Sequence, residues 1–88
     1  MTDRAAIQAA VKQFILEAFL PGEDPELLTP ETELMSGGIL DSVATLRLVT
    51  FLEDRFGIEV MAHEADEEHL NTLATIAALV AAKERPVT

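Results

Sequence analysis

The chain of 88 residues contains no cysteine, tryptophan or tyrosine, and its aromatic residues are four phenylalanines. Without cysteine there are no disulfide bonds and no thiolate sites, so the fold must be stabilised by packing alone. Strand-like alternation is also scarce, whereas small aliphatic residues are abundant. This balance favours closely packed helices over a sheet.

Basic residues are few: six Lys and Arg stand against 16 Asp and Glu, which gives a formal net charge of −10. Such a chain is repelled by nucleic-acid phosphates and by anionic lipid surfaces, so we expect neither as a partner. The acidity either attracts basic protein surfaces or only keeps a small domain in solution, and composition does not choose between the two.

Long uncharged runs that could span a bilayer are missing, and the N-terminus lacks the basic-then-apolar order of a signal peptide. We therefore expect a cytoplasmic protein that does not associate with membranes. The length predicts a single domain over residues 1–88, too small for a deep active site.

Capping residues and aliphatic spacing predict the helices. Thr2 and Asp3 begin the first, which ends at Pro21. The others cover about residues 42–56, a short turn or two within 64–69, and residues 72–85. A loop from about residue 21 to residue 41 separates the first two helices, and a connection this long in a small domain usually carries function. The prediction is an all-α four-helix bundle with a long first loop and a short third helix.

Helical periodicity also predicts which side chains are buried. The stripe expected on the second helix comprises Val43, Leu46, Val49, Leu52 and Phe56, widened by Leu48 and Phe51. The stripe expected on the last helix comprises Leu73, Ile76, Ala77, Leu79 and Val80. The loop is expected to be pinned by Leu27, Leu28, Leu34, Met35, Ile39 and Leu40. Met35 and Met61 are expected to fill gaps in a core that includes the four phenylalanines.

The segment from Gly37 to Val43 contains the one chemically suggestive arrangement. Two glycines permit close approach by another molecule, and Asp41 and Ser42 then open a helix. Free N–H groups and the helix dipole at that point favour a negative charge such as a phosphate ester. Ordinary helix capping, worth about 0.5–2 kcal/mol, accounts for the same local features and is the commoner reason for them.

Catalysis by the chain itself is not expected. Ser42 lacks the elbow motif and the base of a serine hydrolase, so another protein must activate it if it reacts. His63 and His69 are six residues apart and would not share a helical face, so no metal site is expected.

The sequence resembles the acyl carrier and peptidyl carrier protein family over nearly its whole length. The residues that carry this resemblance are Gly38-Ile39-Leu40-Asp41-Ser42-Val43, Leu46-Arg47-Leu48-Val49 and Leu52-Glu53-Asp54-Arg55-Phe56-Gly57-Ile58-Glu59-Val60. Asp-Ser alone is a weak signal of this family. The residues on both sides of it match the family pattern at the same distances from Asp-Ser, and this combination is a strong signal.

The resemblance implies that Ser42 carries a covalent 4'-phosphopantetheine arm, transferred from coenzyme A by a phosphopantetheinyl transferase. The thiol of the arm would hold an acyl or aminoacyl group that a ligase loads and that downstream synthase or tailoring enzymes use, with the carrier acting as a monomer. The surface that contacts the transferase or other partners would comprise Asp41, Val43, Ala44, Arg47, Glu53 and Asp54.

Departures from the family pattern bear on the pathway. Val43 replaces the commoner Leu, and Ala44 and Arg47 stand where carriers of fatty acid synthesis tend to be acidic. Arg47 either pairs with Glu31 or Glu33, which is the simpler role, or repels basic fatty-acid-synthase partners.

We therefore predict a discrete carrier of polyketide or nonribosomal peptide biosynthesis. One alternative is a housekeeping acyl carrier protein of fatty acid synthesis. The other is an acidic helical interaction module without a cofactor, in which Ser42 only caps a helix.

Overall fold

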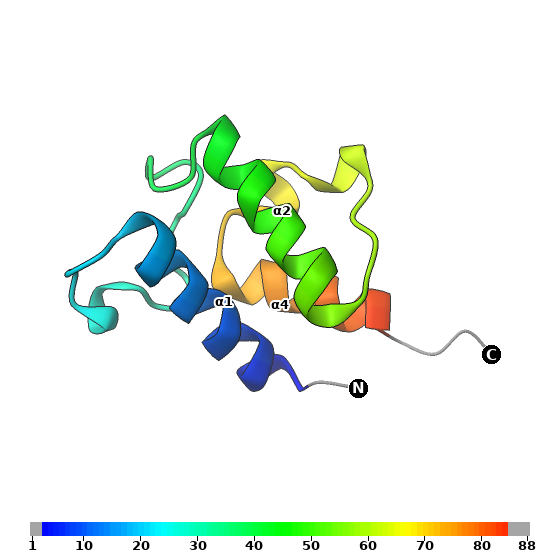
Figure 1. The fold of residues 1–88 in the computed structure, drawn as a ribbon, viewed down its shortest axis with the longest axis horizontal. Helices are drawn as coiled ribbons and strands as arrows, with labels where there is room; N and C mark the ends of the chain where they lie inside the picture. Colours follow the sequence, from blue (N-terminus) through cyan, green and yellow to red (C-terminus); the bar gives the residue numbers. More distant parts are fainter. Residues whose placement is uncertain (1–2, 85–88) are drawn as a thin grey trace.

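The computed structural model describes residues 3–84, and every regular element within them is helical. The elements are α1 (Arg4–Phe19), η1 (Pro25–Leu27), α2 (Ser42–Phe56), η2 (Ala62–Glu64), α3 (Glu67–Leu70) and α4 (Leu73–Glu84). Figure 1 shows the lower end of α2 in front of α4, with α1 to the left of both and the first loop at the same side. The predicted all-α four-helix bundle, with its long first loop and short third helix, is confirmed.

The ends of the long helices follow the predicted capping residues. The Asp3 carboxylate accepts a hydrogen bond from the Ala6 N–H at 2.8 Å and begins α1. Gly57 ends α2 with a φ of 66°, a left-handed conformation that glycine adopts without strain. The hydroxyl of Thr72 accepts from the Thr75 N–H at 3.1 Å just before α4. The predicted roles of Thr2, Arg85 and Pro86 lie outside the described residues.

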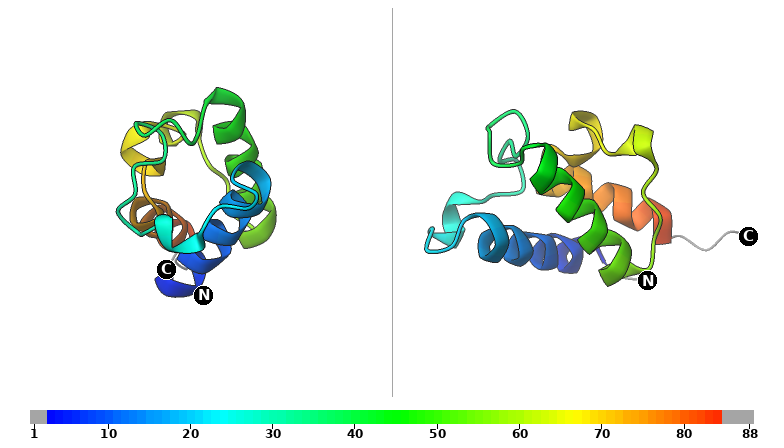
Figure 2. Two further views of the ribbon diagram at one scale, coloured as in Figure 1. Left: turned by 90° about the vertical axis from the view of Figure 1, so that its left-hand side faces the viewer. Right: turned by 45° about the horizontal axis from the view of Figure 1, so that its top comes forward.

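The core lies between α1, α2 and α4, and the first loop and α3 complete a ring around it (Figure 2). Its aliphatic residues come from every part of the described chain: Ile7, Val11, Ile15, Leu28, Leu34, Leu40, Ala44, Leu48, Leu52, Leu70, Leu73, Ile76, Ala77, Leu79 and Val80. The inward stripe predicted on α4 is confirmed in full. Leu28, Leu34 and Leu40 pin the first loop as predicted, whereas Leu27 is 67% exposed and does not.

The face of α2 that enters the core differs from the predicted stripe. Val43 and Leu46 were expected inside but are 66% and 65% exposed, and Ala44 and Thr45 are buried in their place. Apolar residues occur on more than one side of this helix, so two stripes satisfy helical spacing, and packing selects the stripe that contains Leu48. The small side chains of Ala44 and Thr45 allow the start of α2 to lie close to its neighbours.

Two further burial predictions need correction. Met61 is 44% exposed and fills no gap in the core, because it lies where the chain enters η2. The four phenylalanines are half-buried and pack against the edge of the core rather than inside it.

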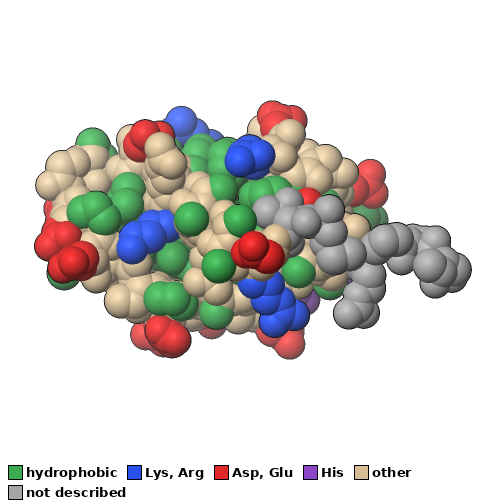
Figure 3. Space-filling model, turned by 90° about the horizontal axis from the view of Figure 1, so that it is seen from below, with side chains coloured by type: hydrophobic (Ala, Val, Ile, Leu, Met, Phe, Trp, Pro, Cys, Tyr) green, Lys and Arg blue, Asp and Glu red, His purple; other side chains and the backbone are tan. Residues whose placement is uncertain are grey.

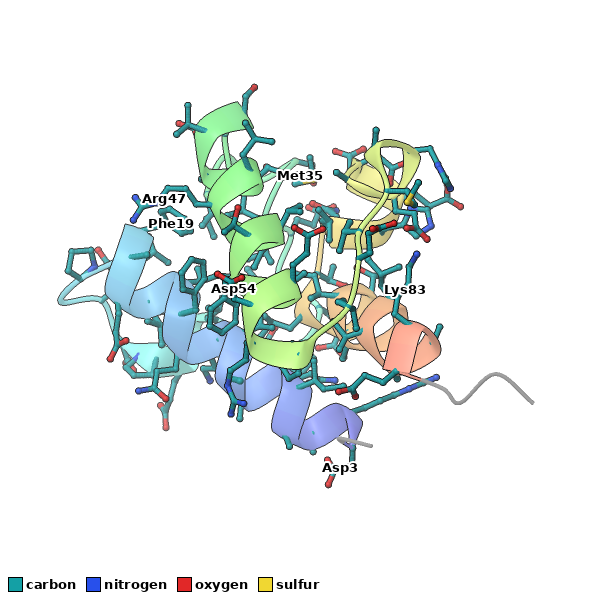
Figure 4. The ribbon with its side chains drawn as sticks, turned by 45° about the vertical axis from the view of Figure 1, so that its right-hand side comes forward. Asp3, Phe19, Met35, Arg47, Asp54 and Lys83 are labelled. Carbon is teal, nitrogen blue, oxygen red and sulfur yellow. The ribbon has the colours of Figure 1, made fainter. Side chains whose placement is uncertain are left out.

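The segment between α2 and α4 is fixed by polar contacts. The Lys83 ammonium of α4 lies 2.6 Å from a carboxylate oxygen of Glu64 in η2. Figure 4 shows Lys83 reaching from α4 toward this segment.

None of the helices in residues 3–84 has the length and apolar character needed to cross a membrane.

Replacing Leu48 by Ala should lower the free energy of unfolding by about 2–5 kcal/mol, because the change leaves a cavity in a close-packed core. The matched change Leu46→Ala, on an exposed position of the same helix, should cost about 0.5 kcal/mol or less. Urea unfolding of the two variants checks both values. Equal losses would show that the assignment of the buried face is wrong.

Candidate functional site

Asp41 is the N-cap of α2. One oxygen of its carboxylate accepts a hydrogen bond from the Ala44 N–H at 2.7 Å. Its backbone carbonyl accepts from the Thr45 N–H at 2.9 Å and from the Thr45 hydroxyl at 2.8 Å. The Asp41 side chain therefore satisfies one of the N–H donors that a helix leaves open in its first turn, that of Ala44, and the Asp41 carbonyl accepts the first hydrogen bond of the helix.

Ser42, the first residue of α2, has no part in this capping. Its side chain is exposed, and its hydroxyl makes no hydrogen bond with any residue from 3 to 84. The N–H groups of Ser42 and Val43 likewise have no acceptor within that range. The capping interpretation is thus correct for Asp41 and wrong for Ser42, whose hydroxyl is exposed beside two unsatisfied N–H donors at the positive end of a helix dipole.

A hollow of about 590 Å³ opens beside Ser42, between the start of α2 and the segment that leads into α3. Its lining combines apolar side chains with two carboxylates: Met35, Leu40, Asp41, Ser42, Thr45, Leu46, Ala65 and Glu67. Met35 lies between α2 and the η2–α3 segment in Figure 4. A flexible group attached to the hydroxyl would therefore have both apolar and acidic surface within reach.

Asn71 fastens the loop that leads to Ser42, and sequence reasoning missed it. Its side-chain oxygen accepts hydrogen bonds from the N–H of Met35 at 2.9 Å and of Ser36 at 3.0 Å. The Ser36 hydroxyl lies 3.3 Å from the same oxygen, and the backbone carbonyl of Asn71 accepts from the N–H of Leu34. The partners of the side-chain oxygen are 35 and 36 residues away in the chain, so no local pattern indicates the contact.

Residues 15–81 match the family described as phosphopantetheine attachment site. The chain belongs to this carrier-protein family. Two curated relatives are named D-alanyl carrier protein. The one from Streptococcus sanguinis is 38% identical over 66 residues, which cover 75% of this chain and 80% of the relative. The one from Bacillus velezensis is 40% identical over 50 residues, which cover 57% of this chain and 64% of the relative, so the match spans less than two thirds of that protein.

The cofactor predicted from the sequence, covalently attached 4'-phosphopantetheine, is confirmed by the family. The start of α2 fits such a group, because it offers a free hydroxyl and N–H donors suited to a phosphate ester. An acidic interaction module without a cofactor is therefore wrong for this carrier.

The expected partner surface is only partly exposed. Val43, Arg47 and Asp54 are on the surface of α2, but Ala44 is 6% exposed and packs into the core. The placement of Ala44 on the contact face was wrong because its side of the helix faces inward. Glu53 is half-buried, and its carboxylate accepts a hydrogen bond from the Val60 N–H at 3.0 Å.

The predicted ion pair of Arg47 with Glu31 or Glu33 is also wrong. The Arg47 guanidinium instead lies 5.5 Å from the centre of the Phe19 ring of α1. Figure 4 shows these two side chains together, with Asp54 farther along α2. The arginine is therefore held by a ring and forms no ion pair with the described residues.

His69 and Asp66 form the electrostatic pair that caps α3. The Asp66 carboxylate accepts from the His69 N–H at 3.0 Å and lies 2.7 Å from His69 Nδ1. The hydrogen bond with Asp66 raises the pKa of His69, with a smaller contribution from the charge of Glu68, and the same bond lowers the pKa of Asp66. A carboxylate oxygen of Glu68 lies within 4.8 Å of the Asp66 carboxylate and of the His69 ring. The capping of α3 by Asp66 is sufficient to explain why these side chains lie close together.

Replacing Asn71 by Leu should loosen the attachment loop, because three donors lose their acceptor. We expect the amides of Met35 and Ser36 to exchange with deuterium at least about tenfold faster, which corresponds to about 1.4 kcal/mol. Asn71→Asp keeps an acceptor oxygen and should restore most of the protection. Unchanged exchange in the Leu variant would refute this role.

The His69–Asp66 pair should make stability depend on pH. A raised folded-state pKa means that protonated His69 stabilises the fold below its ordinary pKa of 6.5, and that this contribution is lost as pH rises through the raised value. The Asp66 contribution is lost on acidification through its lowered pKa.

Thermal unfolding of the wild type and of His69→Gln checks this expectation. The wild type should exceed the variant in Tm at about pH 6, and the difference should shrink at about pH 9. A difference that stays constant between the two pH values would contradict it.

Proposed function

We propose that Ser42 is the point of attachment of the phosphopantetheine arm and that the protein is a carrier without catalytic activity of its own. The observation that carries this proposal is the exposed Ser42 hydroxyl, free of hydrogen bonds to the described residues, at the start of a helix that lies within the family match. A side chain that caps the helix or packs in the core would be unavailable to a modifying enzyme.

The chemistry expected at Ser42 is a phosphoryl transfer. The hydroxyl oxygen attacks the phosphorus of coenzyme A that bears the pantetheine, a phosphodiester forms, and adenosine 3',5'-bisphosphate leaves. The proton of the hydroxyl passes to a base of the transferase, since no base of residues 3–84 forms a hydrogen bond with the hydroxyl. Once attached, the arm supplies the thiol that this cysteine-free chain lacks.

An amino acid is the cargo that the surroundings of Ser42 favour. Asp41 and Glu67 bring two carboxylates to the hollow beside Ser42, and they would attract the ammonium group of an aminoacyl thioester. A long acyl chain gains nothing from these charges. Two relatives are named D-alanyl carrier protein, so D-alanine is the first cargo to test.

Exposed apolar side chains beside Ser42 provide a docking surface for the transferase and for a loading ligase. Val43 and Leu46 are about two-thirds exposed, and they flank the hydroxyl on the first two turns of α2. Solvent-exposed aliphatic side chains grouped at a reactive residue are typical of protein contacts. We propose that the partner enzymes contact Val43 and Leu46 rather than Ala44. These enzymes would act with the carrier in the cytoplasm.

Ser42→Ala should abolish loading while leaving the free energy of unfolding nearly unchanged, because the hydroxyl makes no hydrogen bond with the described residues. The measurement is intact mass after incubation with coenzyme A and a broad-specificity phosphopantetheinyl transferase, together with urea unfolding. The wild type should gain the mass of one phosphopantetheine group. Asp41→Asn, which keeps a capping oxygen, serves as a folded control, and Asp41→Ala should lower stability by about 1 kcal/mol.

A wild-type protein that gains no mass under these conditions, or a Ser42→Ala variant that gains it, would refute the assignment. The cargo is tested separately by purifying the protein from its native host under conditions that preserve thioesters. Hydroxylamine release should yield an amino acid, and chiral chromatography identifies it. Release of a fatty acid would contradict the proposed cargo but not the carrier function.

A further inference from the structure

Four phenyl rings form a continuous row between α1 and α2. Phe14 and Phe51 stack with their ring centres 4.3 Å apart and 12° between their planes. Phe19 meets Phe14 edge-on at 5.6 Å, and Phe56 meets Phe51 edge-on at 6.4 Å. All four rings are half-buried, so the row presents apolar surface at the outside of the bundle.

An arginine lies over each end of this row. The guanidinium of Arg47 is 5.5 Å from the centre of Phe19, and that of Arg55 is 5.5 Å from the centre of Phe56. Both arginines are exposed, and neither forms an ion pair with residues 3–84. Stacking on a ring restricts a guanidinium but leaves the N–H donors at its edge free, so both are prepared to bind carboxylates.

A groove of about 470 Å³ runs between the two arginines. We call it the Arg47–Arg55 groove; it is lined by Phe14, Arg47, Thr50, Phe51, Asp54 and Arg55. Its ionic lining consists of two cations and one anion, in a chain whose net charge is −10. Figure 3 shows Lys and Arg side chains spread among hydrophobic ones over the lower face of the molecule, with most Asp and Glu side chains toward the rim.

The position of this groove connects it with Ser42. Arg47 also lines a second hollow, of about 350 Å³, whose lining includes Asp41 and Val43. Ser42 and Arg55 are both on α2, 13 residues apart, which corresponds to about 20 Å along the helix. A molecule that covers both points must be as large as a protein segment.

From these features we infer that the Arg47–Arg55 groove docks an acidic segment of a partner enzyme, one that places an apolar side chain on the phenyl rings and carboxylates on the two arginines. The net charge of the carrier repels acidic surfaces, whereas the two arginines of the groove attract carboxylates, so the carrier is oriented as such a segment docks. The identity of the partner as an enzyme that acts on the tethered group rests on the proposed function at Ser42.

The test uses the full chain labelled with nitrogen-15 and two probe peptides. One peptide is Glu-Glu-Phe-Phe-Glu-Glu, acetylated and amidated, and the other is the same with Lys in place of Glu. Net charge alone predicts that only the basic peptide binds. We expect the acidic peptide to shift the amide signals of the groove residues in a saturable way; these are Phe14, Arg47, Phe51 and Arg55. The basic peptide should shift these four signals no more than it shifts the amide signals of acidic residues outside the groove.

Two double variants with the same change of net charge distinguish binding in the groove from the effect of the protein's overall electrostatic field. Arg47→Glu with Arg55→Glu should abolish the saturable shifts. Arg4→Glu with Lys12→Glu, which alters two cations of α1 that do not line the groove, should change the affinity by less than about threefold. The replaced side chains are exposed except that of Lys12, which is half-buried, and amide spectra of the free variants verify that both fold.

Absence of localised shifts, or equal loss in both double variants, would overturn the inference. Concentration-dependent shifts of the free protein at the same residues would also overturn it, because the occupant would then be a second copy. Ser42→Ala should bind the acidic peptide as the wild type does, since the hydroxyl does not line the groove. A wild-type protein that binds the peptide but cannot be loaded would refute the carrier function alone, and a wild-type protein that is loaded but does not bind the peptide would refute the groove alone.

Discussion

The capping of α2 by Asp41 is the interaction on which the site depends. Because its carboxylate occupies the Ala44 N–H and its carbonyl accepts from Thr45, the helix begins without help from the next side chain. The Ser42 hydroxyl is therefore not needed to cap the helix, and it is exposed at the positive end of the helix dipole. A serine that capped its own helix would have to break that bond before it could be modified.

The loop before Asp41 must hold the same end of the helix in place. Asn71 supplies the anchor from the junction of α3 and α4, and buried leucines supply the apolar contacts. α3 in turn is capped by Asp66, whose carboxylate also contacts the His69 ring, and Glu67 of α3 lines the hollow beside Ser42. The hollow is therefore bounded by two helix starts, each capped by an aspartate, that packing brings together.

Charge acts at two scales on this carrier. The net charge of −10 repels most acidic surfaces, whereas the Arg47–Arg55 groove offers a small region of opposite sign next to the site. The arginines are fixed by aromatic rings instead of by carboxylates, so their charge is not cancelled locally. A surface of this kind combines general repulsion with one attractive orientation, which is a basis for specificity rather than for high affinity.

Much of the fold was determined by the sequence, because its signals are local. Helical spacing, the caps at Asp3, Asp41 and Gly57, and the position of Ser42 beside a helix start all involve residues within a few positions of one another. Three features were decided by the tertiary structure: the face of α2 that carries Ala44 and Leu48 inward, the placement of Arg47 on Phe19, and the bonds of Asn71 to the loop. Each depends on which elements pack together, and helical periodicity alone does not distinguish between two apolar stripes or join residues that lie far apart in the chain.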